Sequence, residues 1–323
     1  MKKDYTYAVA RIRSRELSLL TKQDINNLLA AKTYSDCIAW LLDKGFGGDE
    51  VNSDNVSDIL SAERKKLWEL MAELTDDLSP FDVFRYSDDF HNLKVSVKAV
   101  TRDVNPSGMF MQNGTVDGEK IYEAIKSHDY KQLPEHLSAP AKEAMTVLLQ
   151  TGDGQACDII IDVACLNAIY KRAKETDSSV IMLYAELTVA SADIKTAVRC
   201  QKNGKSLAVI SGALAPCESL NINLLARAAA KSAEDIYSYL SVTSYAAAVE
   251  KLKQSPSAFE KWCDDKLIES IKPQKSEPFT IGPLAAYIIA RENEIKAIRL
   301  ILSAKLNDLD ITAINERLRD MYV

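Results

Sequence analysis

The sequence predicts an all-helical protein built from internal repeats. Across most of the chain, apolar residues recur at intervals of three and four, which is the periodicity of a helix with one buried face. The 323 residues include only 11 glycines and 9 prolines, and residues 1–79 and 141–215 contain no proline. Long stretches without proline leave room for uninterrupted helices. A short helical phrase also occurs three times at a regular interval, which indicates a repeat.

The phrase consists of a polar residue, an aliphatic residue and a lysine, followed within about one helical turn by a second aliphatic and a second basic residue. Its copies are Asn92–Lys98, Asp193–Arg199 and Glu294–Arg299. The lysines of successive copies lie 101 residues apart. In the third copy the second basic residue comes one position early. A fixed period of this length predicts similar supersecondary units that bury their apolar faces against one another.

Two further echoes support a period near 100 residues. A trio of residues recurs 96 positions later at the same mutual spacing: Ile25, Leu29 and Tyr34, then Ile121, Ile125 and Tyr130. Residues 7–11 read YAVAR and residues 287–291 read YIIAR. Because the second echo links the two ends, we expect the end of the chain to close on its beginning. We expect three helical repeats, at 1–103, 104–204 and 205–323.

In the first repeat, helices are expected over 5–20, 22–31, 35–44, 56–78 and 81–100. The first of these would place Tyr7, Ala10, Leu17 and Leu20 near one face. The glycine cluster at 45–48 is expected to end the third helix, because it lacks the preceding strand and the following lysine of a phosphate-binding loop. Pro80 is expected to end the fourth.

Residues 101–118 carry most of the turn-forming residues of the first half and are expected to be a loop. Later helices are expected over 121–126, 141–149, 158–175, 179–202, 220–231, 233–252, from 283 onward and after 310, with a break around Pro134 and Pro140. Gly204 would end the helix over 179–202. The proline-rich stretch 272–283 is the second expected loop, and Pro283 suits the first position of a helix.

Composition excludes several classes of protein. A hydrophobic content of 47% with 27% charged residues is typical of a globular chain. The net charge of −6 argues against nucleic acid as a partner. The longest apolar stretches, at 206–215 and 284–290, are far shorter than the roughly 20 residues of a membrane span. No signal-peptide pattern follows Met1, so we expect a cytoplasmic protein. The six cysteines form no C-x-x-C pair and are expected to be reduced, buried thiols.

Motifs that would indicate catalysis or nucleotide binding are missing from the sequence. There is no G-x-S-x-G, H-E-x-x-H, phosphate-binding loop or dinucleotide fingerprint. The one metal candidate is Asp88, Asp89 and His91, where the first and last could face one cation from a helix; a solvated helix surface explains the same residues. The lysines of the repeated phrase admit two interpretations as well. They could meet a partner at equivalent points of the repeats, or lie along a packed helix with their charged ends in water.

Both ends of the chain resemble a known family. The opening residues 7–13 (YAVARIR) with 19–21 (LLT), and the closing residues 290–302 (ARENEIKAIRLIL) with 317–323 (RLRDMYV), are similar to the C subunit of the prokaryotic V-type, or archaeal A-type, ATPase. This protein is the relative of the eukaryotic d subunit. The resemblance extends over the whole length and includes the three-fold repeat. One departure is Ala297, where the family often has asparagine.

The resemblance implies an all-helical, funnel-like body of three similar domains with pseudo-three-fold symmetry. It implies no catalytic site, no cofactor, no metal and no bound nucleotide. The implied partners are the D and F subunits of the rotor shaft and the membrane proteolipid ring, with the shaft seated in the funnel. The implied place is cytoplasmic, peripheral to the cell membrane. The implied work is mechanical, linking ATP hydrolysis or synthesis to H⁺ or Na⁺ transport. On this interpretation the candidate partner contacts are Lys94, Lys195, Lys296 and Arg299.

Two other hypotheses belong to different classes. A free-standing helical-repeat scaffold for protein–protein interaction would have shorter, more regular repeats in an open solenoid. A helical metal-dependent hydrolase would use Asp88, Asp89 and His91 and would retain its metal tightly.

Overall fold

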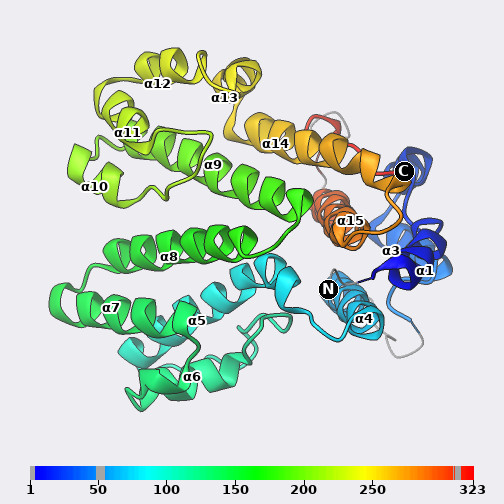
Figure 1. The fold of residues 1–323 in the computed structure, drawn as a ribbon, viewed down its shortest axis with the longest axis horizontal. Helices are drawn as coiled ribbons and strands as arrows, with labels where there is room; N and C mark the ends of the chain where they lie inside the picture. The colour runs from blue at the N-terminus through cyan, green and yellow to red at the C-terminus, as the bar shows by residue number, and fades with distance from the viewer. Residues whose placement is uncertain (1–3, 49–54, 308, 310–313) are drawn as a thin grey trace. The chain divides into compact units, whose positions relative to one another are not determined.

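The computed structural model describes residues 4–48, 55–307, 309 and 314–323, and every regular element in those ranges is helical (Figure 1). The all-helical prediction is therefore confirmed. The chain divides into two compact units. Unit 1 comprises residues 1–78, 178–180 and 250–323, and unit 2 comprises residues 79–177 and 181–249. The division into three repeats with pseudo-three-fold symmetry stays a prediction.

Unit 1 brings the two ends of the chain together, as the echo between residues 7–11 and 287–291 predicts. Its helices are α1 (Thr6–Glu16), α2 (Lys22–Ala30), α3 (Tyr34–Asp43), α4 (Val56–Leu74), α14 (Pro256–Ile271) and α15 (Gly282–Leu306), and α13 (Val249–Gln254) starts at its boundary. Helix α15 packs against α1, α2, α3, α4 and α14. A helix contacted from so many directions is buried almost all round, which explains why its apolar residues are not confined to one face.

Local sequence signals position the short helices of unit 1. Thr21 and Thr33 each form a capping box, with Asp24 and Asp36 respectively, at the start of α2 and α3. In a capping box two backbone N–H groups that lack helical partners are satisfied by side chains. These caps fix where α2 and α3 begin, and therefore which of their residues face α15.

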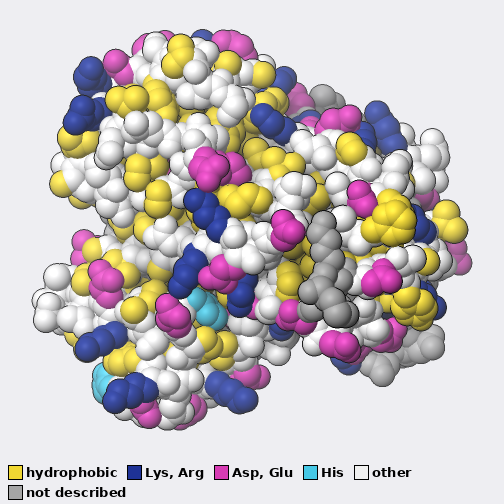
Figure 2. All heavy atoms as spheres, in the orientation of Figure 1, with side chains coloured by type: hydrophobic (Ala, Val, Ile, Leu, Met, Phe, Trp, Pro, Cys, Tyr) yellow, Lys and Arg dark blue, Asp and Glu magenta, His cyan; other side chains and the backbone are white. Residues whose placement is uncertain are grey.

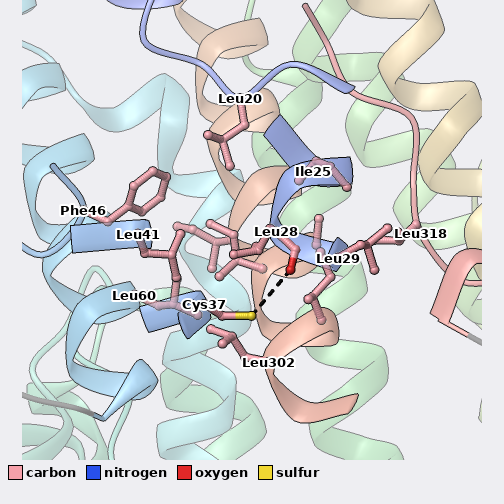
Figure 3. Close-up of a cluster of buried hydrophobic side chains, with 14 of the residues drawn as sticks. Leu20, Ile25, Leu28, Leu29, Cys37, Leu41, Phe46, Leu60, Leu302 and Leu318 are labelled. Carbon is pink, nitrogen blue, oxygen red and sulfur yellow. Dashed lines mark hydrogen bonds between the residues drawn. The ribbon is translucent and has the colours of Figure 1, made fainter. Parts of the chain in front are cut away.

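The core of unit 1 is a cluster of aliphatic side chains between α2, α3, α4 and α15 (Figure 3). Leu28, Leu41, Leu60 and Leu302 are fully buried in it. The thiol of Cys37 donates to the Leu28 carbonyl oxygen at 3.5 Å. All six cysteines are free thiols in the structure; four of them are buried as expected, whereas Cys165 and Cys217 are only half-buried.

Unit 2 contains the helices between the two halves of unit 1. They are a 3₁₀ helix η1 (Ser79–Phe84), α5 (Tyr86–Arg102), α6 (Gly118–Lys126), a 3₁₀ turn η2 (Tyr130–Gln132), α7 (Glu135–Thr151), α8 (Gly154–Lys174), α9 (Ser179–Lys202), α10 (Leu207–Gly212), α11 (Ile222–Lys231), α12 (Ala233–Leu240) and a 3₁₀ turn η3 (Ala246–Ala248). Helix α5 packs against α6, α7 and α8, and α11 packs against α10 and α12. The first two residues of α9 fall in unit 1.

Several expected helix boundaries are wrong. Helix α14 was not expected, although Ser255 caps it through the Ala258 N–H and Pro256 opens it. The helix expected over 233–252 is broken after Leu240, where the Thr243 hydroxyl donates to the Leu240 carbonyl oxygen. Pro140 lies inside α7 instead of breaking it. Pro140 is the sixth residue of α7, so the helix continues without the hydrogen bond that an N–H at this position would give to the His136 carbonyl oxygen.

The expected buried face of the first helix is also wrong. Helix α1 ends at Glu16, so Leu17 lies beyond it and is 89% exposed, and Tyr7 is 70% exposed. Ala8, Val9 and Ile12 form the buried face instead. Asp310, which we expected to cap a terminal helix, lies outside the described residues. A 3₁₀ segment, η4 (Lys272–Ser276), occupies part of the expected loop over 272–283.

Candidate interaction site on the repeated helices

The three copies of the repeated phrase all lie on helices: the first on α5, the second on α9 and the third on α15. In each copy the polar residue that opens the phrase is buried. Asn92 and Asp193 are fully buried, and Glu294 is 1% exposed. A buried polar side chain needs a hydrogen-bond partner, so these three positions should be tied to other groups.

Each of these buried residues accepts a backbone N–H from a connecting segment. The Met111 N–H donates to Asn92 Oδ1 at 2.8 Å, and the Ala215 N–H donates to Asp193 Oδ1 at 3.0 Å. The Leu20 N–H donates to Glu294 Oε1. The opening residue of the phrase therefore has one structural task in all three copies, which is to hold a neighbouring segment against its helix.

The lysines of the first and third copies reach acidic residues on neighbouring helices. Lys94 Nζ lies 2.5 Å from Asp162 of α8, and Lys296 Nζ lies 3.3 Å from Asp264 of α14. The side chains of these lysines are 26% and 52% exposed. Lys195 of the second copy is half-buried. The charged ends of Lys94 and Lys296 therefore lie at the boundary with solvent, where a partner could reach them, but both already have an acidic neighbour.

Neighbouring basic residues follow the same pattern. Lys98, the last residue of the first copy, pairs with Asp158 at 2.7 Å. Asp264 accepts Arg319 Nε at 2.9 Å in addition to Lys296. Arg299 is exposed on α15. The four predicted contact residues belong to different units, Lys94 and Lys195 to unit 2 and Lys296 and Arg299 to unit 1. Their role in partner contact stays a prediction.

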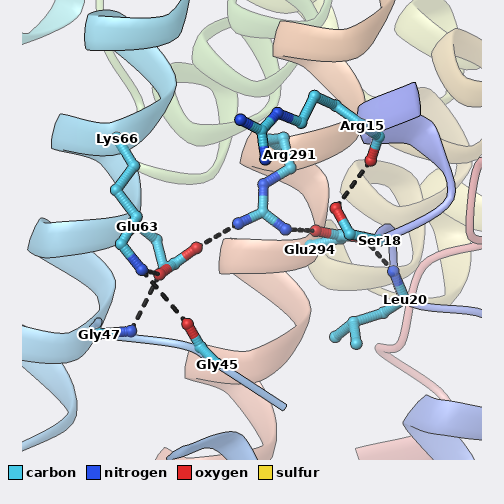
Figure 4. Close-up of polar contacts among 9 residues, drawn as sticks. All are labelled: Arg15, Ser18, Leu20, Gly45, Gly47, Glu63, Lys66, Arg291 and Glu294. Carbon is cyan, nitrogen blue, oxygen red and sulfur yellow. Dashed lines mark hydrogen bonds and ion pairs between the residues drawn. The ribbon is translucent and has the colours of Figure 1, made fainter. Parts of the chain in front are cut away.

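Arg291 is the centre of a buried cluster of charges that sequence reasoning missed (Figure 4). Its guanidinium contacts Glu63 of α4 and lies 2.5 Å from Glu294 Oε2 on its own helix. The side chains of all three residues are less than 10% exposed. Burial raises the pKa of Glu294 to about 7, and the positive charge of Arg291 and the Leu20 N–H partly oppose this rise.

Glu63 also joins this cluster to the turn that ends α3. It accepts the Gly47 N–H at 2.9 Å and pairs with Lys66 at 2.7 Å. A pocket of about 360 Å³ lies over the cluster, and its walls carry charges of both signs, including Arg15 and Glu69. The signal in the sequence was an arginine and a glutamate three positions apart between two apolar stretches of one long helix, because such a pair is seldom buried without partners.

The metal candidate residues do not gather around one point. Asp89 is fully buried, accepts the Thr115 hydroxyl at 2.5 Å and the Val116 N–H at 3.0 Å, and lies 3.5 Å from His136 Nε2. His91 is exposed, and its Nε2 lies 3.2 Å from the Met109 carbonyl oxygen. Within the described part of the chain, no group of three or more metal-ligating side chains comes together.

A second pocket, of about 410 Å³, lies in unit 2 beside the ring of His136. This ring stacks on Tyr86 with a centroid distance of 4.4 Å. Arg172 lines the same pocket and pairs with Asp82 at 3.3 Å and Glu175 at 2.9 Å. These mutual pairings satisfy the charged groups, so the arrangement has the features of a polar packing cluster.

The outer surface shows no large field of one charge on the described residues of the face displayed in Figure 2, where basic and acidic side chains are interspersed. Among the residues that the structure describes, no helix is both long enough and apolar enough to cross a bilayer.

Comparison with known proteins identifies the family. The model of the ATP synthase (C/AC39) subunit family matches residues 8–317. The chain is 22% identical to the C subunit of the V-type sodium ATPase of Enterococcus hirae, over 96% of this chain and 97% of the relative. It is 23% identical to the C subunit of the A-type ATP synthase of Desulfurococcus sp., over 97% and 90%, and 24% identical to that of Thermococcus kodakarensis, over 97% and 89%. With an all-helical fold and a match over nearly its whole length, this chain belongs to the ATP synthase (C/AC39) subunit family.

Proposed function

We propose that this chain is the central-stalk adaptor of a rotary V-type or A-type ATPase. In this role it joins the D–F rotor shaft to the membrane proteolipid ring, and thereby links ATP hydrolysis or synthesis to H⁺ or Na⁺ transport. Membership of the family makes the chain a non-catalytic subunit of such a complex. The observation that carries the proposal is that the family match and the relatives extend over nearly the whole chain, so no large part is left over for another activity.

The helical construction suits a mechanical task. Helix α15 is buried along most of its 25 residues and is contacted by α1, α2, α3, α4 and α14, so it cannot bend without disturbing a packed core. Unit 2 is likewise built from long helices, including α9 with 24 residues. We propose that the chain works from the cytoplasmic side, peripheral to the membrane.

We assign the partner contact to the basic residues of the repeated phrase. Lys94, Lys195, Lys296 and Arg299 would face acidic or polar surfaces of the shaft or the ring. Charges at the rim of an interface set orientation and association rate more than affinity, so the contact should weaken as salt increases. Asp162 and Asp264 would compete with the partner for Lys94 and Lys296.

The first experiment measures binding of the purified chain to the D–F shaft and, separately, to the detergent-solubilised proteolipid ring. Binding to both, with one copy of the chain per shaft, is the expected result. Binding to neither by a folded preparation would reject the adaptor role and favour the free-standing scaffold.

A second experiment tests the assigned residues by charge reversal. The triple variant carries Lys94→Glu, Lys195→Glu and Lys296→Glu, and a control variant of equal charge carries Lys131→Glu, Lys231→Glu and Lys251→Glu at exposed positions elsewhere. We expect the first variant to lose binding and its salt dependence, and the control to retain both. Equal binding by the two variants would remove the lysines from the interface and leave the adaptor role to the first experiment.

Reversal at Lys94 also disturbs its own ion pair with Asp162. An exchange variant, Lys94→Asp with Asp162→Lys, keeps an ion pair within the protein and moves the positive charge to α8. If Lys94 contacts the partner, the exchange weakens binding although the fold keeps its ion pair. If the loss of binding comes only from the broken pair, the exchange restores it.

A further inference from the structure

The first and second copies of the repeated phrase each hold the loop that follows their helix, but they use different side chains, Asn92 and Asp193, to do so. In the first copy, Asn92 satisfies both backbone groups of Met111. Its Oδ1 accepts the Met111 N–H at 2.8 Å, and its Nδ2 donates to the Met111 carbonyl oxygen at 2.9 Å. An amide is suited to this task because it carries one acceptor and one donor side by side.

In the second copy Asp193 occupies the position of Asn92. The two helix residues lie 101 positions apart, and their loop partners Met111 and Ala215 lie 104 positions apart. In both copies the residue that caps the next helix, Asp117 or Asn221, follows the loop partner by six positions. The two arrangements therefore correspond in sequence and in hydrogen bonding.

One atom distinguishes the second copy from the first. Asp193 Oδ1 accepts the Ala215 N–H at 3.0 Å, as Asn92 Oδ1 accepts the Met111 N–H. Asp193 Oδ2, which takes the place of the donating Nδ2, is buried and has no hydrogen-bond partner among the described residues. An ionised carboxylate can only accept, and a buried oxygen without a donor is destabilising because it has lost its hydrogen bonds to water. A proton on Oδ2 would turn the group into the same donor–acceptor pair that Asn92 provides.

Within the described ranges, the surroundings of Asp193 supply no compensating charge. Burial raises the pKa of Asp193 to about 7, and only the Ala215 N–H opposes the rise. In the segment that follows α9, the Cys217 thiol is the titratable group that interacts electrostatically with Asp193. Burial raises the pKa of this thiol to about 12 and keeps it neutral. On α9 itself, Lys195 lies roughly 200° around the helix from Asp193. Glu186 lies on the same face but is tied to the Ser219 N–H at 2.7 Å.

The third copy shows the alternative solution. Glu294 is also buried and also accepts a backbone N–H, from Leu20, but its second oxygen pairs with Arg291 at 2.5 Å. A guanidinium stabilises the ionised carboxylate there. The amide in the first copy and the arginine in the third each provide a donor from within the protein. The second copy has no such donor in the part of the chain that the structure describes. A proton bound to Asp193 Oδ2 would have to supply the missing donor.

We infer that Asp193 is a neutral carboxylic acid in the folded protein, that its Oδ2–H donates to the Ala215 carbonyl oxygen, and that loss of this proton loosens residues 203–221. This segment contains α10, where Leu207 and Val209 are 44% and 39% exposed. The fold therefore contains a pH-sensitive latch that holds an exposed apolar helix in place. The inference is independent of the proposed function.

The direction of the pH effect follows from linkage. The ordinary pKa of the aspartate is 3.8, and in the folded protein it is raised to about 7. The folded protein therefore retains a proton that the unfolded chain has lost, so the latch contributes its full stability below the ordinary value and loses it as pH rises through about 7. Above that range, ionised Asp193 is favoured only when the segment opens and lets water reach it.

The test is amide hydrogen exchange of the Ala215 segment in the full chain between about pH 4 and about pH 9, corrected for the intrinsic pH dependence of exchange. We expect protection of residues 206–220 in the natural protein to fall roughly ten-fold for each pH unit between about 4 and about 7, where only the closed state keeps the proton, and to level off above about 7. In the Asp193→Asn variant, the same segment should keep its protection across the range. A natural protein and variant with the same pH profile would overturn the inference, as would a loss of protection spread evenly over unit 2.

A mirror variant keeps the test decisive even if Asp193→Asn does not fold. Asn92→Asp places an acid in the first copy, where the hydrogen-bond partner on the described residues is the Met111 backbone, so a new pH dependence should appear in residues 104–117 and leave residues 206–220 as before. Its absence would contradict the equivalence of the two positions. An infrared band of a protonated carboxyl group, present in the natural protein at neutral pH and missing in Asp193→Asn, reports the proton directly, and its absence would also overturn the inference.

Discussion

Replacing Arg291 by methionine should strongly destabilise unit 1. The substitution keeps much of the volume and the apolar part of the side chain but removes the charge that faces Glu63 and Glu294. Both carboxylates are nearly inaccessible to water, with 6% and 2% of their side chains exposed. Removing one partner of a buried ion pair costs about 3–5 kcal/mol, because an uncompensated charge is left in a poorly polarisable interior.

Loss of Arg291 should destabilise the ionised form of Glu294 more than that of Glu63. Glu63 keeps Lys66 at 2.7 Å and the Gly47 N–H at 2.9 Å, whereas Glu294 keeps only the Leu20 N–H among the described residues. The loss of the contact between the Arg291 guanidinium and the Phe46 ring, whose centroid lies 5.3 Å away, adds about 0.5–2 kcal/mol. We therefore expect a total of about 3.5–7 kcal/mol, most of it from Glu294.

The assay uses the tryptophans, because Trp40, Trp68 and Trp262 are the three tryptophans of the chain and all lie in unit 1. Their fluorescence during urea unfolding follows that unit. Arg64→Met is the matched control, because Arg64 also joins α4 to α15, through Glu292 at 2.6 Å, but this pair is 18% and 24% exposed. A pair in partial contact with water should cost about 1 kcal/mol or less.

Two results would refute the reasoning. The first is an Arg291→Met variant that loses no more stability than Arg64→Met. The second is failure of the double variant Arg291→Met with Glu294→Gln to recover stability, because the uncompensated charge is the stated cause. A pH dependence should accompany the single variant. Burial already raises the pKa of Glu294, and loss of Arg291 raises it further, so the destabilisation should be smaller at about pH 6, where the carboxyl can be neutral, than at about pH 8.

Two further predictions concern packing. Leu28→Ala removes a fully buried side chain from the core of unit 1 and should cost about 2–5 kcal/mol by tryptophan fluorescence, whereas Leu306→Ala, at a side chain 68% exposed, should change stability by about 0.5 kcal/mol or less. Gly114→Ala would place a Cβ atom 2.3 Å from Asp89 Oδ1 and should lower the thermal midpoint measured by circular dichroism, whereas Gly154→Ala, with nothing within 4 Å of the new Cβ, should leave it unchanged or raised. Equal midpoints for the two glycine variants would show that the loop around Gly114 yields to the methyl group.

The sequence predicted the class of fold because helical periodicity is a local property. The helix over 179–202 was predicted with the bounds that the structure has, since an uninterrupted apolar pattern runs up to Gly204. Helix α14 was missed because charged residues interrupt its apolar spacing and its buried face depends on α15. The break after Leu240 was missed because hydroxyl groups that bond to the backbone compete with the helix only in a suitable setting.

The candidate site was predictable only in part. The lysines of the repeated phrase were visible because they stand out from an apolar pattern, but their pairing with Asp162 and Asp264 depends on which helices meet. The opening polar residue of each copy was recognised as part of the repeat, yet its burial could not be read from spacing. The same holds for Arg291, whose likeness to Arg11 in the YAVAR echo does not extend to burial, since Arg11 is exposed and Arg291 is 8% exposed.

The discontinuous make-up of unit 1 has a consequence for synthesis. Helices α2, α3 and α4 leave the ribosome early, but α15, against which all three pack, is translated only after the whole of unit 2. During that interval their leucine-rich faces have no permanent partner, whereas unit 2 can already fold. Nascent chains with exposed apolar helices are the usual clients of chaperones. The amino-terminal helices of this protein should therefore be the segment on which a ribosome-associated chaperone acts longest, until the final helix emerges and completes the core.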